Sequence, residues 1–145
     1  ILCPGDKVIL MVVDGQGGGI GATVIKRLRE VFGHGPVVYA LGTNSVATSR
    51  MMKAGANKGA TGENAIVHTS SRVDVIIGPL AVIMAKAMMG ELTPAMAESI
   101  SSSRAATILI PLTQENTTLV GVEGEPLPHL VERVMGLIRE RVKNV

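Results

Sequence analysis

Apolar runs that end in glycine or in short polar turns recur along this chain and predict buried strands. The first, residues 7–13, shows no alternation of apolar and polar side chains. A strand without a polar face is buried on both faces, as in the parallel sheet of an α/β protein. Similar runs span residues 36–41, 74–79 and 106–111. Together they predict the strands of one mostly parallel sheet.

Segments with apolar residues at helical spacing alternate with these runs. Over residues 20–33 one face of the predicted helix is apolar, formed by Ile20, Val24, Leu28 and Val31. Asn44 or Ser45 is expected to cap the next helix. The remaining helices are predicted over residues 46–54, 65–72, 80–89 and 93–101 and from about residue 126.

Two of these predicted helices have distinctive sequences. The segment 80–89 is apolar nearly all round and carries a single charge, on Lys86. A helix of this kind is buried by protein on most sides, which in a small chain favours a subunit interface. The helix over 93–101 begins with Thr93 as N-cap and Pro94 in the first helical position.

The edges of the sheet are less regular in sequence. Residues 57–64 are polar and contain glycine, so we expect a loop there, and it stays open whether residues 57–61 add an extra strand outside the second. Residues 118–122 follow the run 106–111 too closely for a parallel crossover and are therefore expected to pair with it as an antiparallel hairpin. The predicted fold is one three-layer, Rossmann-like α/β domain over residues 1–145, with a mostly parallel sheet and an antiparallel edge strand.

The most distinctive stretch follows the first strand, where five glycines occur within seven residues. A glycine turn between a strand and a helix brings backbone N–H groups and a helix N-terminus up to a phosphate. The turn after the second strand lies at the same edge of a parallel sheet and can hold a sugar. The predicted ligand-binding residues are Gly15, Gln16, Gly17, Gly18, Gly19, Ile20, Gly21, Thr43 and Asn44.

Two features weaken a dinucleotide interpretation of this stretch. The acidic residue that binds ribose hydroxyls at the end of the second strand is replaced by Gly42, Thr43 and Asn44. Asp14 stands directly before the first glycine, where a carboxylate would face the phosphate. Asp14 has three possible roles, which are to ligate Mg²⁺, to bind a ligand hydroxyl, or to hydrogen-bond its own turn.

Candidate catalytic residues are few. Glu63, in a polar cluster with Thr61, is a candidate general base or metal ligand, and Asp14 is the other candidate. The alternative for Glu63 is a helix-start turn capped by Thr61. The glycine spacing matches that of short-chain dehydrogenases, but their catalytic Tyr-x-x-x-Lys is absent, because the sole tyrosine, Tyr39, is followed four positions later by Thr43. Whether the protein is an enzyme stays open.

Composition excludes several classes of function. Hydrophobic residues make up 46% of the 145 residues, whereas aromatic residues make up 1%, which disfavours a base-stacking surface for nucleic acid. The three histidines lack metal-ligand spacing, so no metal site is predicted. The apolar runs are too short for a transmembrane helix. With Cys3 as the only cysteine, the sequence is consistent with a cytoplasmic protein.

Several motifs together resemble a family of short bacterial proteins classed as a domain of unknown function. They are Val-Asp-Gly-Gln-Gly-Gly-Gly-Ile-Gly at 13–21, Ala-Leu-Gly-Thr-Asn at 40–44, Ala-Gly-Ala at 54–56, Ala-Thr-Gly-Glu-Asn-Ala-Ile-Val at 60–67 and Asp-Val-Ile-Ile-Gly-Pro at 74–79. The resemblance runs from about residue 7 to the last helix. It implies a Rossmann-like fold and no established activity.

The sequence as a whole favours a homo-oligomer that binds a nucleotide or another small phosphorylated metabolite at the glycine-rich turn. The identity of the cofactor is not indicated. The alternative is a non-catalytic sensor or a structural module without a phosphate ligand.

Overall fold

The computed structural model describes residues 7–112, 115–122 and 124–143, which form an α/β fold. Its five strands are β1 (Ile9–Asp14), β2 (Val37–Gly42), β3 (Lys58–Thr61), β4 (Val75–Pro79) and β5 (Ala106–Ile110). They form one sheet in the order β3-β2-β1-β4-β5, and every pair is parallel. The order reverses between β1 and β4, and in open sheets of this kind the ligand crevice lies beyond the carboxyl ends of the strands at that point.

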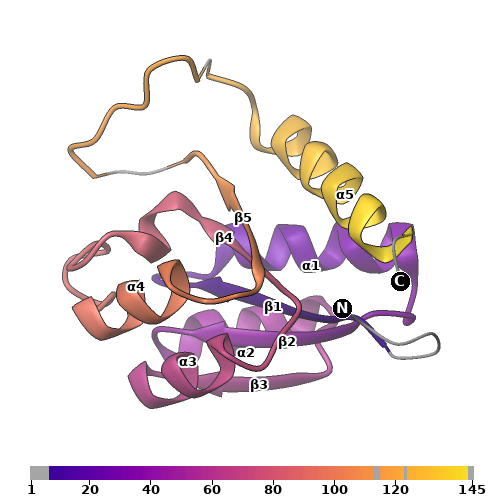
Figure 1. The fold of residues 1–145 in the computed structure, drawn as a ribbon, viewed down its shortest axis with the longest axis horizontal. Helices are drawn as coiled ribbons and strands as arrows, with labels where there is room; N and C mark the ends of the chain where they lie inside the picture. Colours follow the sequence, from indigo (N-terminus) through magenta and orange to yellow (C-terminus); the bar gives the residue numbers. More distant parts are fainter. Residues whose placement is uncertain (1–6, 113–114, 123, 144–145) are drawn as a thin grey trace.

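Helices cover both faces of the sheet (Figure 1). The helices α1 (Gly19–Phe32), α2 (Ser45–Ala54) and α5 (Leu127–Lys143) lie on one face. The helices α3 (Glu63–Ser70) and α4 (Pro94–Ser101) lie on the other, together with the 3₁₀ turn η1 (Leu80–Ile83). The predicted three layers are therefore confirmed.

The central strand β1 shows why the apolar runs lack polar alternation. Leu10 and Val12 point into the core beneath α1, α2 and α5, whereas Met11 and Val13 point into the core beneath α3 and α4. All four side chains are fully buried. Both sets of alternate residues must be apolar because each faces a helical layer.

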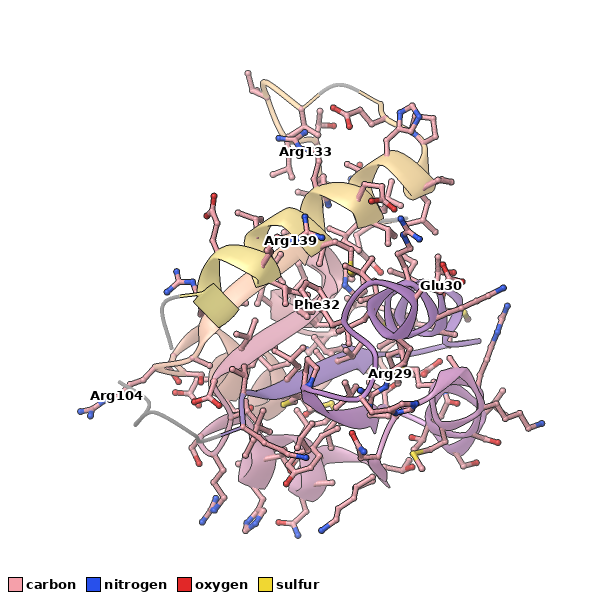
Figure 2. All side chains as sticks on the ribbon, turned by 90° about the vertical axis from the view of Figure 1, so that its right-hand side faces the viewer. Arg29, Glu30, Phe32, Arg104, Arg133 and Arg139 are labelled. Carbon is pink, nitrogen blue, oxygen red and sulfur yellow. The ribbon has the colours of Figure 1, made fainter. Side chains whose placement is uncertain are left out.

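At the end of the sheet where β2 and β3 begin, Arg29 links α1 to the loops before these two strands. Its guanidinium donates to the carbonyl oxygens of Gly33, Pro36 and Gly55 and to Oδ1 of Asn57. Burial lowers the pKa of Arg29. On the same face of the sheet, Figure 2 shows Arg139 of α5 lying over Phe32, with 5.7 Å between the guanidinium carbon and the ring centroid.

The structure corrects the prediction for the last strand. β5 is a parallel edge strand, and the described residues 115–122 form turns and irregular chain in place of an antiparallel partner. Figure 1 shows the described part of the connection between β5 and α5 lying away from the sheet. Short separation in sequence excluded a parallel crossover but did not require any pairing. Residues 1–6, with Cys3, and residues 113–114 lie outside the described residues.

Two other expectations were wrong. The polar segment 57–64 contains the parallel edge strand β3, outside β2, because an edge strand with exposed residues needs no apolar run. The apolar segment 80–89 forms only the 3₁₀ turn η1, followed by irregular chain. Its buried side chains face the core of their own chain, so the helix that favoured a subunit interface is absent.

Candidate functional site

The glycine-rich loop leaves β1 through a tight turn closed by a hydrogen bond from Gly18 N–H to the Gly15 carbonyl, at 2.9 Å. Gly18 has a φ of 72°, and a Cβ there would press against the backbone of Ala47 in α2. A Cβ at Gly15 would overlap the Met88 sulfur and the Thr43 hydroxyl. The glycines therefore let α2 and the chain after β4 close onto the loop.

The carboxylate of Asp14, the last residue of β1, accepts hydrogen bonds from the backbone of this loop. Its Oδ1 accepts from Gly15 N–H and its Oδ2 from Gly21 N–H, both at 2.8 Å. The side chain is only 4% exposed. Burial raises the pKa of Asp14, and although hydrogen bonds from Gly21, Gly15 and Ile20 and the charge of Arg50 oppose it, the pKa remains above its usual value. Of the three possible roles, the structure shows Asp14 hydrogen-bonding its own turn.

The loop after β2 contributes two side chains, of which Asn44 has a fixed orientation. Asn44 is the N-cap of α2, and its Oδ1 accepts from Ala47 N–H at 2.9 Å. The Nδ2 group must therefore face the other way, where it donates to the Gln16 carbonyl at 2.9 Å. Thr43 is anchored through its backbone N–H, which donates to the Asp14 carbonyl at 3.0 Å. The predicted pair Thr43 and Asn44 thus lies against the glycine-rich loop.

The carboxylate of Glu91 links these two loops through hydrogen bonds. Its Oε1 accepts from the Thr43 hydroxyl at 2.7 Å, from Asn44 Nδ2 at 2.7 Å and from Gln16 N–H at 3.0 Å. None of the hydrogen bonds among the described residues uses its Oε2. Burial raises the pKa of Glu91, but the three hydrogen bonds outweigh burial, so the pKa lies below its usual value.

Glu91 belongs to an irregular segment, residues 84–92, which we call the strap. The strap closes on itself through a 2.7 Å hydrogen bond from Lys86 N–H to the Leu92 carbonyl. Three non-glycine residues in it have left-handed backbone conformations, with φ values of 69° at Lys86, 58° at Met88 and 57° at Met89. Such conformations are strained for residues with a Cβ and persist only when the surroundings enforce them.

Some hydrogen-bonding groups of the glycine-rich loop remain available. The N–H groups of Gly17 and Gly19 take part in none of the hydrogen bonds among the described residues. Arg50 of α2 lies beside both residues, and its Nη1 is 3.4 Å from the Gly17 carbonyl. Gly17 is exposed and Gly19 half-buried. Two amides and one guanidinium therefore surround a solvent-accessible position at the N-terminus of α1.

Glu63 does not meet Asp14. It is exposed at the start of α3, and its side chain hydrogen-bonds to no other described residue. Thr61 is not the cap of this helix, because Gly62 occupies the N-cap and the Thr61 hydroxyl pairs with that of Thr48 at 2.7 Å. Among the described residues, no three His, Cys, Asp or Glu side chains gather where a metal ion would need them.

Sequence analysis missed Glu91 and Met88. The only signal was that an acidic residue follows the apolar segment closely. Because that segment was predicted to be a helix, the sequence did not indicate which part of the fold Glu91 would contact. Its position over the loops after β1 and β2 arises because the chain after β4 crosses the point where the strand order reverses.

These features define an α/β protein with a Rossmann-like sheet and a glycine-rich loop covered by chain from the switch point. The chain belongs to the family described as "Domain of unknown function (DUF3842)", whose model matches residues 9–143. The resemblance to an uncharacterised family is thereby confirmed. None of the described helices combines the length and apolar character needed to span a membrane.

Two solved structures are similar to this chain. A universal stress protein in complex with cAMP is 13% identical, with a TM-score of 0.42, over 72% of this chain and 98% of its own. A dodecameric FMN-dependent UbiX-like decarboxylase from Escherichia coli O157:H7 is also 13% identical, with a TM-score of 0.46, over 90% of this chain and 92% of its own. No curated protein matches the chain.

Proposed function

We propose that this protein binds a nucleotide or another small phosphorylated metabolite at the loops that follow the carboxyl ends of β1 and β2. The observation that carries this proposal is the pair of uncommitted N–H groups at Gly17 and Gly19 beside the Arg50 guanidinium. Backbone amides at a helix N-terminus, together with a cation, form the usual surroundings of a bound phosphate.

Only part of the glycine-rich stretch is proposed to contact the phosphate. Gly21 N–H donates to Asp14 and Gly18 N–H to the Gly15 carbonyl, so these amides serve the turn itself. Asp14 is then a structural residue that holds the amides in place. A catalytic role for Glu63 would require the ligand to extend along the carboxyl ends of β2 and β3.

Thermal-shift screening and calorimetry with ATP and NAD test this proposal. A ligand at about a hundred times its dissociation constant adds roughly 2.7 kcal/mol to stability. Arg50→Gln should weaken binding about tenfold through loss of a charge-assisted contact. The exposed Lys53, on the same helix, provides the matched control Lys53→Gln, which should bind as the wild type does.

A second variant places the ligand at the loop. Gly19 has room for a side chain, because an added Cβ would make only ordinary contact with Arg50, so Gly19→Val should fold. The new side chain should block the approach of the phosphate and abolish the thermal shift. Gly136→Val, in open space on α5, controls for the substitution itself. Unchanged ATP binding by Gly19→Val, or no shift with either compound, would contradict the proposal.

We also propose that the protein is a homo-oligomer. In the alternative function, a non-catalytic sensor, the subunit interface would transmit the binding of the metabolite. The support is the described part of the β5–α5 connection, where Leu119 and Val122 are exposed and Val120 is 99% exposed. Exposed apolar side chains grouped in this way are typical of interaction surfaces. Sedimentation velocity at micromolar concentration distinguishes an oligomer from a monomer.

A further inference from the structure

Three hydrogen-bond donors from two loops converge on a single oxygen atom, Oε1 of Glu91. They are the backbone N–H of Gln16, the hydroxyl of Thr43 and the side-chain amide of Asn44. Convergent donors around one negatively charged oxygen are the arrangement by which proteins bind phosphoryl and carboxylate groups.

Two of the donors are held in place by bonds that do not involve Glu91. The turn between Gly15 and Gly18 orients Gln16 N–H, and the N-cap bond to Ala47 orients the Asn44 amide. The Thr43 hydroxyl projects from a residue whose backbone is anchored to Asp14. The pocket of donors is therefore built by β1, β2 and α2, and Glu91 only fills it.

The strap that carries Glu91 is closed under strain. Lys86, Met88 and Met89 keep left-handed conformations, and Met89 gains nothing from burial because its side chain is 97% exposed. Apart from its own turns, the strap is held by Glu91, by the core packing of Ala87 and Leu92, by the buried Met88 side chain against Gly15, and by a 2.8 Å hydrogen bond from Met88 N–H to Glu115. A ligand that replaced Glu91 would remove one of these attachments.

We propose that Gln16, Thr43 and Asn44 form a binding site for an anionic oxygen of the ligand, and that Glu91 occupies this site as an internal competitor until the strap is released. The inference deepens the proposed function and rests on it, because it gives the metabolite a second anionic group, a phosphoryl or a carboxylate, next to the phosphate at Gly17 and Gly19. Ligand binding and strap opening are then one event.

Limited trypsin digestion measures strap opening without any ligand. Lys86 is exposed, but cleavage after it requires the adjacent buried Ala87 to leave the core, so the rate follows the open population. Glu91→Ala should raise cleavage after Lys86 by about tenfold or more, because three bonds to a charged acceptor are lost. Cleavage after the exposed Arg104, before β5, is the internal control and should not change.

Glu98→Gln is the matched control variant for charge, since Glu98 is exposed on α4 and contacts neither loop. It should leave cleavage after Lys86 as in the wild type. Equal cleavage in Glu91→Ala and Glu98→Gln would overturn the role of Glu91 as the attachment of the strap. Glu91→Gln, which keeps the shape of the side chain, should give an intermediate rate and serves if the alanine variant does not fold.

Titration of the ¹⁵N-labelled protein with inorganic phosphate, at constant ionic strength, separates the two sites by amide. The Gln16 amide reports the site filled by Glu91, and the Gly17 and Gly19 amides report the proposed phosphate position. Glu91→Ala should bind phosphate at Gln16 about tenfold or more tightly than the wild type, because the internal competitor is gone. Weaker binding in this variant would make Glu91 a ligand contact and overturn the inference.

Thr43→Val distinguishes an anion site from a mere attachment of the strap. It removes one donor from Glu91, so cleavage after Lys86 should rise. In the Glu91→Ala background, where no internal competitor remains, it removes the same donor from the ligand, so phosphate binding at Gln16 should weaken. Equal or tighter binding in the double variant than in Glu91→Ala would contradict the inference. If phosphate shifts the Gly17 and Gly19 amides of Glu91→Ala but not the Gln16 amide, the further inference is refuted and the proposed function stands. If phosphate shifts none of these amides, the proposed function is refuted as well.

Discussion

Two carboxylates, Asp14 and Glu91, accept backbone N–H groups of the same glycine-rich loop, yet they belong to opposite environments. Asp14 is buried at the end of β1 and bonds to residues within seven positions of itself. Glu91 is half-buried and reaches across 75 positions of sequence to Gln16. Burial leaves the pKa of Asp14 raised, whereas hydrogen bonds leave that of Glu91 lowered.

The difference shows how a site can be both well built and closed. Local bonds to Asp14 fix the shape of the loop irrespective of the remainder of the chain. The bonds to Glu91 come from a strained segment and involve donors that water or a ligand could equally satisfy. Strain at such positions is found where a segment has more than one functional arrangement. The first carboxylate therefore defines the loop, and the second covers it.

The largest expected difference between the two carboxylates is in stability. Asp14→Ala leaves the N–H groups of Gly15 and Gly21 buried without acceptors and should lower the free energy of unfolding by about 3 kcal/mol. Glu91→Ala should cost about 1.5 kcal/mol, the equivalent of a roughly tenfold rise in strap opening, because water can reach the released donors. Urea unfolding of both variants checks this, and equal losses would remove the distinction between a structural and a covering carboxylate.

A smaller effect on stability is expected when either of two adjacent methionines, Met88 or Met89, is replaced by glycine. Both have a left-handed backbone conformation. Met89→Gly should raise the free energy of unfolding by roughly 0.5 kcal/mol, because relief of a left-handed conformation, worth about 1–2 kcal/mol, exceeds the entropic cost of glycine. Met88→Gly gains the same relief but loses a buried side chain and should cost about 2 kcal/mol. A loss of stability in Met89→Gly would show that the strap is not strained there.

The finest test of the comparison is the direction of the pH dependence. The raised pKa of Asp14 gives stability that is present below its unfolded pKa and is lost as the pH rises through its folded pKa. The lowered pKa of Glu91 gives stability that is present above its unfolded pKa and is lost as the pH falls through its folded pKa.

Unfolding measured between about pH 3 and pH 7 for the wild type, Asp14→Asn and Glu91→Gln separates the two contributions. Relative to Asp14→Asn, the wild type should lose stability as the pH rises. Relative to Glu91→Gln, it should gain stability as the pH rises. The same sign of slope for both residues would contradict the assignment of opposite environments.

The sequence by itself determined the interior of this protein. Residues such as Leu10 and Met11 had to be apolar on both faces of β1. The Thr93-Pro94 start of α4 was predicted correctly, and Asn44, one of the two predicted caps of α2, is its N-cap, because these signals are local. The run of glycines after β1 likewise predicted a tight turn into α1.

Only the tertiary structure decided what lies on that turn. The strand β3 satisfies its hydrogen bonds at an exposed edge, and the strap takes left-handed conformations that no propensity of Lys86 or Met88 favours. Both depend on partners distant in sequence, and so does the meeting of Glu91 with Gln16, Thr43 and Asn44. A pattern read along the chain predicts which segments are buried, whereas the choice of partners across the sheet depends on the packing of the whole fold.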